Sequence, residues 1–92
     1  MKYSFVYIMT NKYRTTFYIG MTTNLSKRIT EHAEGTGSLF TKKYNLKDLI
    51  YFEKFTDINQ AIDRERQLKN WHKDWKLNLI RELNPKLETL IY

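Results

Sequence analysis

The fold is decided by residues 2–21, KYSFVYIMTNKYRTTFYIGM, in which a short polar link separates two apolar, strand-like runs. Lys2 to Met9 is rich in the aromatic and β-branched residues that strands favour, and Thr15 to Met21 forms the second run. Because the link is short, the two strands are expected to pair in antiparallel fashion. Each run contains a tyrosine, Tyr7 in the first and Tyr18 in the second, so pairing can bring both phenols to one surface.

The remaining sequence predicts one more strand and several helices. Thr22, Thr23 and Asn24 are N-cap candidates for the first helix. The expected elements are a helix at Leu25 to Glu34, a short helical turn at 39–44, a strand within Leu46 to Phe55, a helix from Thr56-Asp57 to about Asn70 or Trp71, and a helix at Lys73 to Leu83. The order β-β-α-β-α-α predicts a single α+β domain at residues 1–92, with a small, mainly antiparallel three-stranded sheet flanked by helices.

Hydrophobic spacing predicts which helix faces are buried. On the first helix the inner stripe is Leu25, Ile29 and Ala33, at a spacing of four. On the helix that follows the third strand, one face carries Ile58, Ala61, Ile62, Glu65 and Leu68. On the last helix the inward positions are Trp75, Leu79, Ile80 and Leu83.

Composition limits the possible classes of function. Cysteine is absent, which excludes disulfides and thiolate metal ligands and makes a reducing, cytoplasmic location the expectation. No apolar run is long enough for a signal-peptide core or a bilayer span, so no membrane association is expected. The net charge of +6, from 16 Lys and Arg against 10 Asp and Glu, favours polyanionic partners, although a basic protein without such a partner would carry the same charge.

Two pairs of side chains could carry chemistry, and each also has a structural interpretation. Tyr7 and Tyr18 could be half-buried strand tyrosines, whereas the glycine of Tyr18-Ile19-Gly20 would let a phosphate or another backbone approach closely. Arg28 and His32 lie four residues apart and project from one helix face. Arginine there could grip a phosphate and histidine could relay a proton, but a solvated helix face would show the same pattern.

Glu65 is unexpected because a carboxylate on a core-facing stripe costs free energy unless it is paired or binds a cation. A single carboxylate, completed by water and phosphate oxygens, is a typical Mg²⁺ arrangement. The alternative is an ion pair with Lys69, four residues on, or with Arg28 across the core. Asn84, which precedes Pro85, could end the last helix, hydrogen-bond a phosphate or orient a tyrosine.

Taken in order along the chain, these residues resemble the GIY-YIG nuclease domain, and the chain's size resembles the small stand-alone branch of that family. The resemblance spans about Lys2 to Pro85 and rests on Tyr7, Tyr18-Ile19-Gly20, Thr23, Leu25, Arg28, His32, Glu65 and Asn84. The second half of the signature is intact, whereas Phe5-Val6-Tyr7 stands where Gly-Ile-Tyr is expected. Met21 occupies a position at which some members carry a lysine, which removes one possible phosphate contact.

The resemblance implies a divalent-metal-dependent endonuclease that hydrolyses phosphodiester bonds in DNA, either structure-selective or nonspecific. Glu65 would hold one Mg²⁺ or Mn²⁺ ion, and Arg28 would stabilise the pentavalent phosphate. One of the two phenols would accept the proton of the attacking water. The implied catalytic residues are Tyr7, Tyr18, Arg28, His32, Glu65 and Asn84. The resemblance and the basic charge together imply a set of nucleic-acid contacts. The expected residues are Gly20, Lys27, Lys42, Lys43 and Lys69.

The expected partner is DNA, including branched or single-stranded forms. The stand-alone branch has no DNA-recognition domain, so specificity would come from DNA structure or from a protein partner. Tyr13, Tyr44 and Trp71 could stack on unpaired bases, while Trp75 is expected in the core. Two alternatives stay open, namely a non-catalytic nucleic-acid-binding module with the same fold and an interaction domain whose basic face docks an acidic protein.

Overall fold

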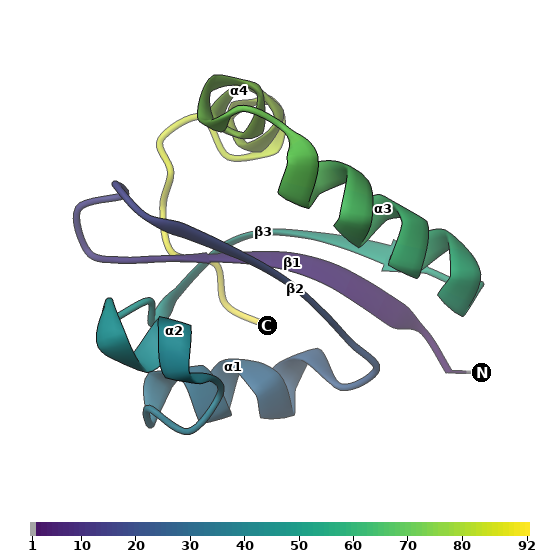
Figure 1. The fold of residues 1–92 in the computed structure, drawn as a ribbon, viewed down its shortest axis with the longest axis horizontal. Helices are drawn as coiled ribbons and strands as arrows, with labels where there is room; N and C mark the ends of the chain where they lie inside the picture. Colours follow the sequence, from purple (N-terminus) through teal and green to yellow (C-terminus); the bar gives the residue numbers. More distant parts are fainter. Residues whose placement is uncertain (1) are drawn as a thin grey trace.

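The structure, a computed structural model, describes residues 2–92 and contains a three-stranded antiparallel sheet with helices on both faces (Figure 1). The elements are β1 (Ser4–Thr10), β2 (Phe17–Thr22), α1 (Leu25–Ala33), α2 (Leu39–Lys43), β3 (Asp48–Phe55), α3 (Ile58–Asn70) and α4 (Lys73–Leu83). This confirms the α+β class and the order β-β-α-β-α-α, with the short turn expected at 39–44 present as α2. No helix within residues 2–92 is both long and apolar enough to cross a membrane.

The central strand β1 is buried along its whole length and pairs antiparallel with both neighbours, in the sheet order β2-β1-β3. Because side chains alternate between the faces of a sheet, Val6 and Ile8 point to one side. Phe5, Tyr7 and Met9 point to the other. The sheet therefore has two separate apolar layers, one on each face.

Different helices cover the two layers (Figure 1). α3 and α4 pack on the Val6 side, where Ala61, Leu68 and Ile80 are fully buried. α1 and α2 lie on the opposite side, where Leu25 joins the layer that contains Tyr7. The Asn24 side chain caps α1 by accepting a hydrogen bond from the Lys27 amide at 3.1 Å, which selects one of the three predicted N-caps. Tyr7 thus faces the helix that carries Arg28 and His32.

The pairing of β1 with β3 contains a bulge. Ile8 pairs with Tyr51 and Met9 with Leu49, which leaves Ile50 as an extra residue on β3. As a result, Ile50 and Tyr51 both contribute to the α3–α4 layer. The bulge also turns the Ile50 carbonyl out of the ladder, where a side chain from the end of α4 binds it.

The chain after α4 packs as an extended segment across β3. The Leu90 amide donates a hydrogen bond to the Leu49 carbonyl at 2.7 Å. The Tyr92 ring then packs edge-to-face on Phe5 and Phe52, with ring centroids 5.4 and 5.2 Å apart. This segment therefore runs from the α4 side of the sheet to the layer that contains Tyr7 (Figure 1).

Four of the predicted inward positions are wrong. Ile58, the first residue of α3, is 48% exposed. Trp75 is 55% exposed and Leu83 is 73% exposed, and Ala33 also lies on the surface. On α4, Ile80 is the one fully buried residue, because this helix meets the sheet along a narrow line rather than a broad face. Trp75 packs instead against the edge of Trp71, 6.0 Å between ring centroids, at the outer surface.

Candidate active site

Two tyrosines and a histidine form one aromatic cluster on the α1 side of the sheet. Tyr7 and Tyr18 come from the paired strands β1 and β2, and their ring centroids are 6.4 Å apart. The His32 ring from α1 lies 5.6 Å from each of them. The tertiary structure therefore brings together both predicted phenols and the predicted histidine.

A chain of hydrogen bonds connects this cluster to α2. The Tyr7 hydroxyl lies 3.0 Å from His32 Nε2, and His32 Nδ1 lies 3.0 Å from the Thr41 hydroxyl. Tyr7, His32 and Thr41 are all at most 2% exposed. Thr41 was not predicted from the sequence, because a threonine in a short helical turn shows no pattern that indicates a buried partner.

Gly20 makes room for the Tyr7 ring. The two residues face each other across the β1–β2 ladder, and Gly20 is buried. A Cβ at Gly20 would overlap Tyr7 Cζ and Oη and would lie 2.9 Å from Cε1. The structure therefore gives Gly20 a packing role against Tyr7, and the phosphate contact predicted for it stays a prediction.

Burial shifts the pKa values of Tyr7 and His32 toward their neutral forms, and nearby charges modify both shifts. Burial raises the pKa of Tyr7 well above its usual value, and the neighbouring Tyr18 raises it further, while Arg28 acts in the opposite direction. The carboxylates of Glu65 and Glu31 also raise this pKa. Burial lowers the pKa of His32 below its usual value, and the positive charge of Arg28 lowers it further, partly offset by Glu31. Arg28 and Glu65 are thus near enough for their charges to act on the Tyr7 hydroxyl.

Arg28 and Glu65 both keep partial access to solvent. Arg28 Nε lies 3.5 Å from Glu31 on the same helix, and its side chain is 39% exposed. Glu65 lies 3.6 Å from Lys69 Nζ, and its side chain is 25% exposed. The sequence left two ion-pair partners open for Glu65, and the structure shows the Lys69 pair.

A divalent ion at this site would have few protein ligands. Within residues 2–92, no three His, Asp or Glu side chains lie together in a way that could hold a metal. The sequence analysis predicted one metal ligand, Glu65. A single, partly exposed carboxylate fits Mg²⁺ or Mn²⁺, which take their remaining ligands from water and substrate phosphates.

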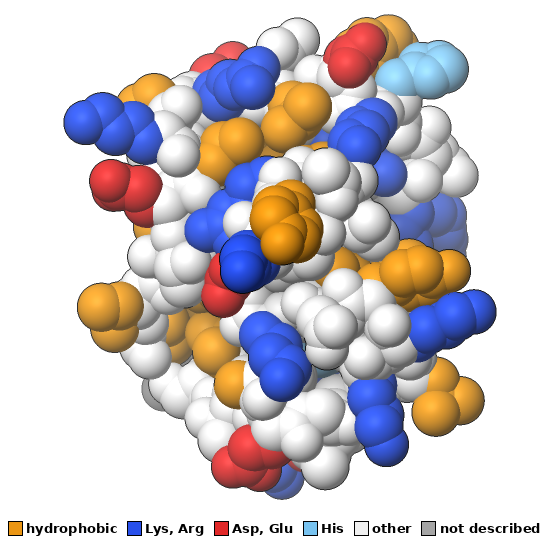
Figure 2. All heavy atoms as spheres, turned by 90° about the vertical axis from the view of Figure 1, so that its left-hand side faces the viewer, with side chains coloured by type: hydrophobic (Ala, Val, Ile, Leu, Met, Phe, Trp, Pro, Cys, Tyr) orange, Lys and Arg blue, Asp and Glu red, His pale blue; other side chains and the backbone are white. Residues whose placement is uncertain are grey.

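Basic and aromatic side chains surround the outer part of the cluster. On α2, Phe40 packs against Tyr18 at 6.1 Å between centroids and against Tyr44 at 4.8 Å. Lys42 and Lys43 are exposed on the same helix, as is Lys27 on α1. Figure 2 looks onto the side of the molecule where the β1–β2 turn and α2 lie, and shows Lys and Arg side chains spread over this face. These three exposed lysines are free to act as the predicted nucleic-acid contacts, which stay a prediction, and Lys69, the fourth, pairs with Glu65.

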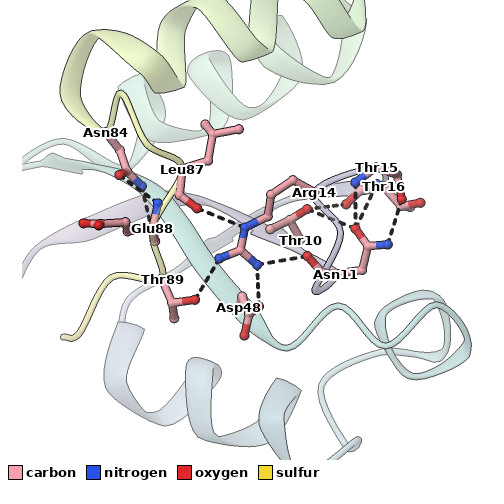
Figure 3. A network of polar contacts seen from close by, with 10 residues as sticks. All are labelled: Thr10, Asn11, Arg14, Thr15, Thr16, Asp48, Asn84, Leu87, Glu88 and Thr89. Atoms are coloured by element: carbon pink, nitrogen blue, oxygen red, sulfur yellow. Dashed lines mark hydrogen bonds and ion pairs between the residues drawn. The ribbon is translucent and has the colours of Figure 1, made fainter.

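Asn84 does not join the cluster (Figure 3). Its amide nitrogen donates to the carbonyls of Ile50, at 3.0 Å, and Glu88, at 2.7 Å. Its amide oxygen accepts from the Glu88 amide at 3.0 Å. The buried side chain is therefore committed to the β3 bulge and to the turn that follows α4, and none of these bonds reaches another predicted catalytic residue. These bonds give Asn84 a structural role at the bulge, whose carbonyl needs a donor, and its catalytic role stays a prediction.

Arg14 links the β1–β2 turn to β3 and to the segment after α4. The sequence analysis did not single it out. It adopts a left-handed conformation, with φ of 59°, in the β1–β2 turn. Its guanidinium pairs with Asp48 and donates to the Leu87 carbonyl at 3.0 Å and to the Thr89 hydroxyl at 2.9 Å (Figure 3). These partners lie 34 to 75 residues away along the chain, so no local sequence pattern could indicate them.

The model of the GIY-YIG catalytic domain matches residues 3–78, which includes β1 through most of α4. The chain belongs to the GIY-YIG family. The match covers both tyrosines, Arg28, His32 and Glu65, whereas Asn84 lies beyond it. Membership in this family makes nuclease chemistry on a nucleic acid the general function.

Other GIY-YIG relatives match nearly end to end. A UPF0213 protein of Staphylococcus haemolyticus is 36% identical over 85% of this chain and 94% of its own length. A UPF0213 protein of Clostridium perfringens is 36% identical over 92% of this chain and 90% of its own. The solution NMR structure of the UPF0213 protein BH0048 from Bacillus halodurans superposes with a TM-score of 0.60, at 26% identity over 91% of this chain and 88% of that one. These relatives are therefore small proteins that consist almost entirely of the matched domain, as expected for the stand-alone GIY-YIG branch.

The structural role of Asn84 in this GIY-YIG domain can be tested by replacing it with Ala. The loss of one buried and two part-buried hydrogen bonds, with the Ile50 carbonyl losing its donor, is expected to cost about 2–4 kcal/mol. This corresponds to a fall in melting temperature of roughly 10–25 °C for a domain of this size, measured by circular dichroism. Asn78→Ala, at an exposed position of α4, is the matched control and should change little. An Asn84→Ala variant that kept its melting temperature but lost all cleavage would support the catalytic role predicted for Asn84.

Proposed function

We propose that this protein is a divalent-metal-dependent endonuclease that hydrolyses phosphodiester bonds in DNA, with selectivity for DNA structure or none. The observation that carries the proposal is the buried Tyr7–His32 hydrogen bond, with the charges of Arg28 and Glu65 acting on the same phenol. A phenol paired with a neutral imidazole, beside a cation and a partly exposed carboxylate, is a set of groups suited to water attack on a phosphodiester.

The Tyr7–His32 pair is the base of this reaction. A neutral His32 can take the Tyr7 proton at Nε2, and the Tyr7 oxygen then accepts a proton from the attacking water. This transfer leaves a neutral phenol, an imidazolium and a hydroxide that forms the new bond to phosphorus. Burial and the charge of Arg28 lower the pKa of His32, which keeps its imidazole neutral near pH 7 with a lone pair available. Tyr18 packs beside both rings and limits the water that reaches them.

Arg28 is the group that stabilises charge on the phosphate. Its contact with Glu31 is long, at 3.5 Å, and partly exposed, so a phosphate can displace that carboxylate at little cost. The planar guanidinium can then donate two parallel hydrogen bonds to phosphate oxygens. Because charge on these oxygens grows toward the pentavalent state, the interaction strengthens as the reaction proceeds.

Glu65 would hold the metal. A bound Mg²⁺ or Mn²⁺ would supply a Lewis acid for the phosphate oxygens. The Lys69 ammonium, now 3.6 Å from Glu65, is on the exposed side of α3 and can turn toward a DNA phosphate instead. Binding of DNA and metal would thus replace a weak surface ion pair, which contributes only roughly 0.3–0.5 kcal/mol.

The test is cleavage of labelled branched, flapped, double-stranded and single-stranded DNA by the purified protein, with Mg²⁺, Mn²⁺ or EDTA. We expect cleavage of at least one of these substrates with either metal and none with EDTA. Arg28→Ala should abolish it. If no DNA is cut with either metal, or if Arg28→Ala cuts as well as the unmodified protein, the proposal is wrong. Salt-sensitive DNA binding without cleavage would instead identify a non-catalytic binding module.

A further inference from the structure

A socket for the His32 ring is formed by Gly37 and Ser38, in the loop before α2, and by Thr41 on α2. A Cβ at Gly37 would overlap His32 Nδ1 and would lie 2.6 Å from Cε1, so only glycine allows the ring to lie in this position. His32 and Thr41 are each 1% exposed. Within this socket, the Thr41 hydroxyl contacts the inner ring nitrogen Nδ1, and the Ser38 hydroxyl contacts that of Thr41. Gly37, Ser38 and Thr41 were not among the site residues predicted from the sequence.

One direction of hydrogen bonding makes every close contact of the socket a hydrogen bond at the same time. The Thr41 hydroxyl lies 3.0 Å from His32 Nδ1, 2.9 Å from the Ser38 hydroxyl and 3.2 Å from the Ser38 carbonyl. The Ser38 carbonyl, which also accepts from the Lys42 amide at 3.1 Å, can only accept, so its contact with the Thr41 hydroxyl is a hydrogen bond only when Thr41 donates. The Ser38 hydroxyl accepts from the Thr41 amide at 3.1 Å, and its own proton is therefore available for Thr41.

This direction determines the tautomer of the histidine. With the Thr41 proton committed to Ser38, both lone pairs of the Thr41 oxygen face donors, and His32 Nδ1 must carry its hydrogen. The opposite arrangement, with Thr41 donating to Nδ1, would bring the lone pairs of the Thr41 oxygen and the Ser38 carbonyl together at 3.2 Å. A hydrogen on Nδ1 leaves the Nε2 lone pair facing the Tyr7 hydroxyl at 3.0 Å.

We propose that Ser38 and Thr41 are positioning residues that hold His32 as the Nδ1–H tautomer, so that its Nε2 can take the proton of Tyr7. The inference rests on the proposed nuclease function for its purpose, but the tautomer itself is independent of that function. Helix capping alone does not explain the arrangement. Capping of α2 requires the bond from the Thr41 amide to Ser38, whereas the contact of the Thr41 side chain with the imidazole adds nothing to the cap.

The tautomer is measured by long-range ¹H–¹⁵N NMR of the histidine side chains in the ¹⁵N-labelled protein. The chain has two histidines, and His72→Gln identifies the signals of His32. We expect the unmodified protein to show Nδ1 protonated and Nε2 unprotonated. Thr41→Val removes the acceptor for Nδ1–H at nearly constant volume and should move His32 toward the Nε2–H tautomer, whereas Thr41→Ser should restore it.

Cleavage provides the functional readout of the same variants. Thr41→Val is expected to lower kcat by about 10–100-fold with little change in KM, and Thr41→Ser should recover most of the loss. Thr36→Val is the matched control, because the Thr36 hydroxyl bonds only the Glu31 carbonyl in the same loop. Ser38→Ala gives a second test in case Thr41→Val fails to fold.

Three results would overturn the positioning role. One is a His32 that carries its proton on Nε2 in the unmodified protein. Another is a Thr41→Val variant with an unchanged tautomer, and the third is a changed tautomer with unchanged kcat. If the unmodified protein cuts no DNA but shows the expected tautomers, the nuclease proposal fails while the assignment of the Ser38–Thr41 socket stands.

Discussion

Glu65→Gln is expected to reduce metal-dependent DNA cleavage by at least about 100-fold, because the protein would lose its one predicted metal ligand. The amide keeps the shape of the side chain but removes the charge that attracts a divalent ion. Stability should change little, since the carboxylate is partly exposed and its one ion pair is the surface contact with Lys69. The measurements are initial cleavage rates over a range of Mn²⁺ concentrations and the melting temperature.

The matched control for Glu65 is Asp63→Asn, which neutralises an exposed carboxylate two residues away on α3. This variant should cut DNA at the normal rate, because the general loss of one negative charge favours DNA binding slightly. If Glu65→Gln cuts as fast as Asp63→Asn at every metal concentration, Glu65 does not hold the metal. Partial recovery of the Glu65→Gln rate at high Mn²⁺ would support a weakened metal site rather than a lost base.

Gly20→Ala is expected to have the second largest effect, on stability and activity together. The new methyl group would overlap the end of the buried Tyr7 ring, which must move away from His32 or push β2 outward. Overpacking of this kind costs about 2–3 kcal/mol, which lowers the melting temperature by roughly 10–20 °C. Because the Tyr7–His32 bond is disturbed at the same time, cleavage measured well below the new melting temperature should also fall.

Two comparisons separate this overlap from the general effect of replacing glycine. Gly35→Ala places a methyl group where the nearest atom is 3.9 Å away, so its cost of about 1 kcal/mol comes only from the left-handed φ of 80°. The second comparison combines Gly20→Ala with Tyr7→Leu, a shorter side chain that vacates the space. If Gly20→Ala is as costly in that background as alone, the ring of Tyr7 is not the obstacle.

Local pattern was sufficient for most of the secondary structure. The predicted bounds of α4, Lys73 to Leu83, agree with the structure, and α3 and the strands differ by one or two residues at their ends. Periodicity was less reliable for burial. Trp75 occupies an inward position by helical spacing, yet it is exposed, because spacing defines a face but cannot tell how much of that face the sheet covers.

The candidate site was also predicted only in part, because local pattern does not show which distant residues meet. Tyr7 and Tyr18 were expected on one surface because antiparallel pairing and alternation are regular, and the structure places them 6.4 Å apart. Thr41 and Gly37 were not found, since nothing in their local sequence indicates a buried imidazole. The hydrogen-bond partners of Asn84 were not predicted, because one of them is the Ile50 carbonyl at a bulge that the sequence does not reveal.

The sequence by itself determined the order of strands and helices, the antiparallel hairpin and the family to which the chain belongs. These follow from residue preferences, from spacing along one segment and from a signature of nearby positions. Only the tertiary structure decided which polar groups meet. Tyr7 and His32 are 25 residues apart, and Asn84 and the Ile50 carbonyl are 34 apart. A hydrogen bond between such groups depends on the distance and direction in which packed elements present them, and no periodicity within one element contains that information.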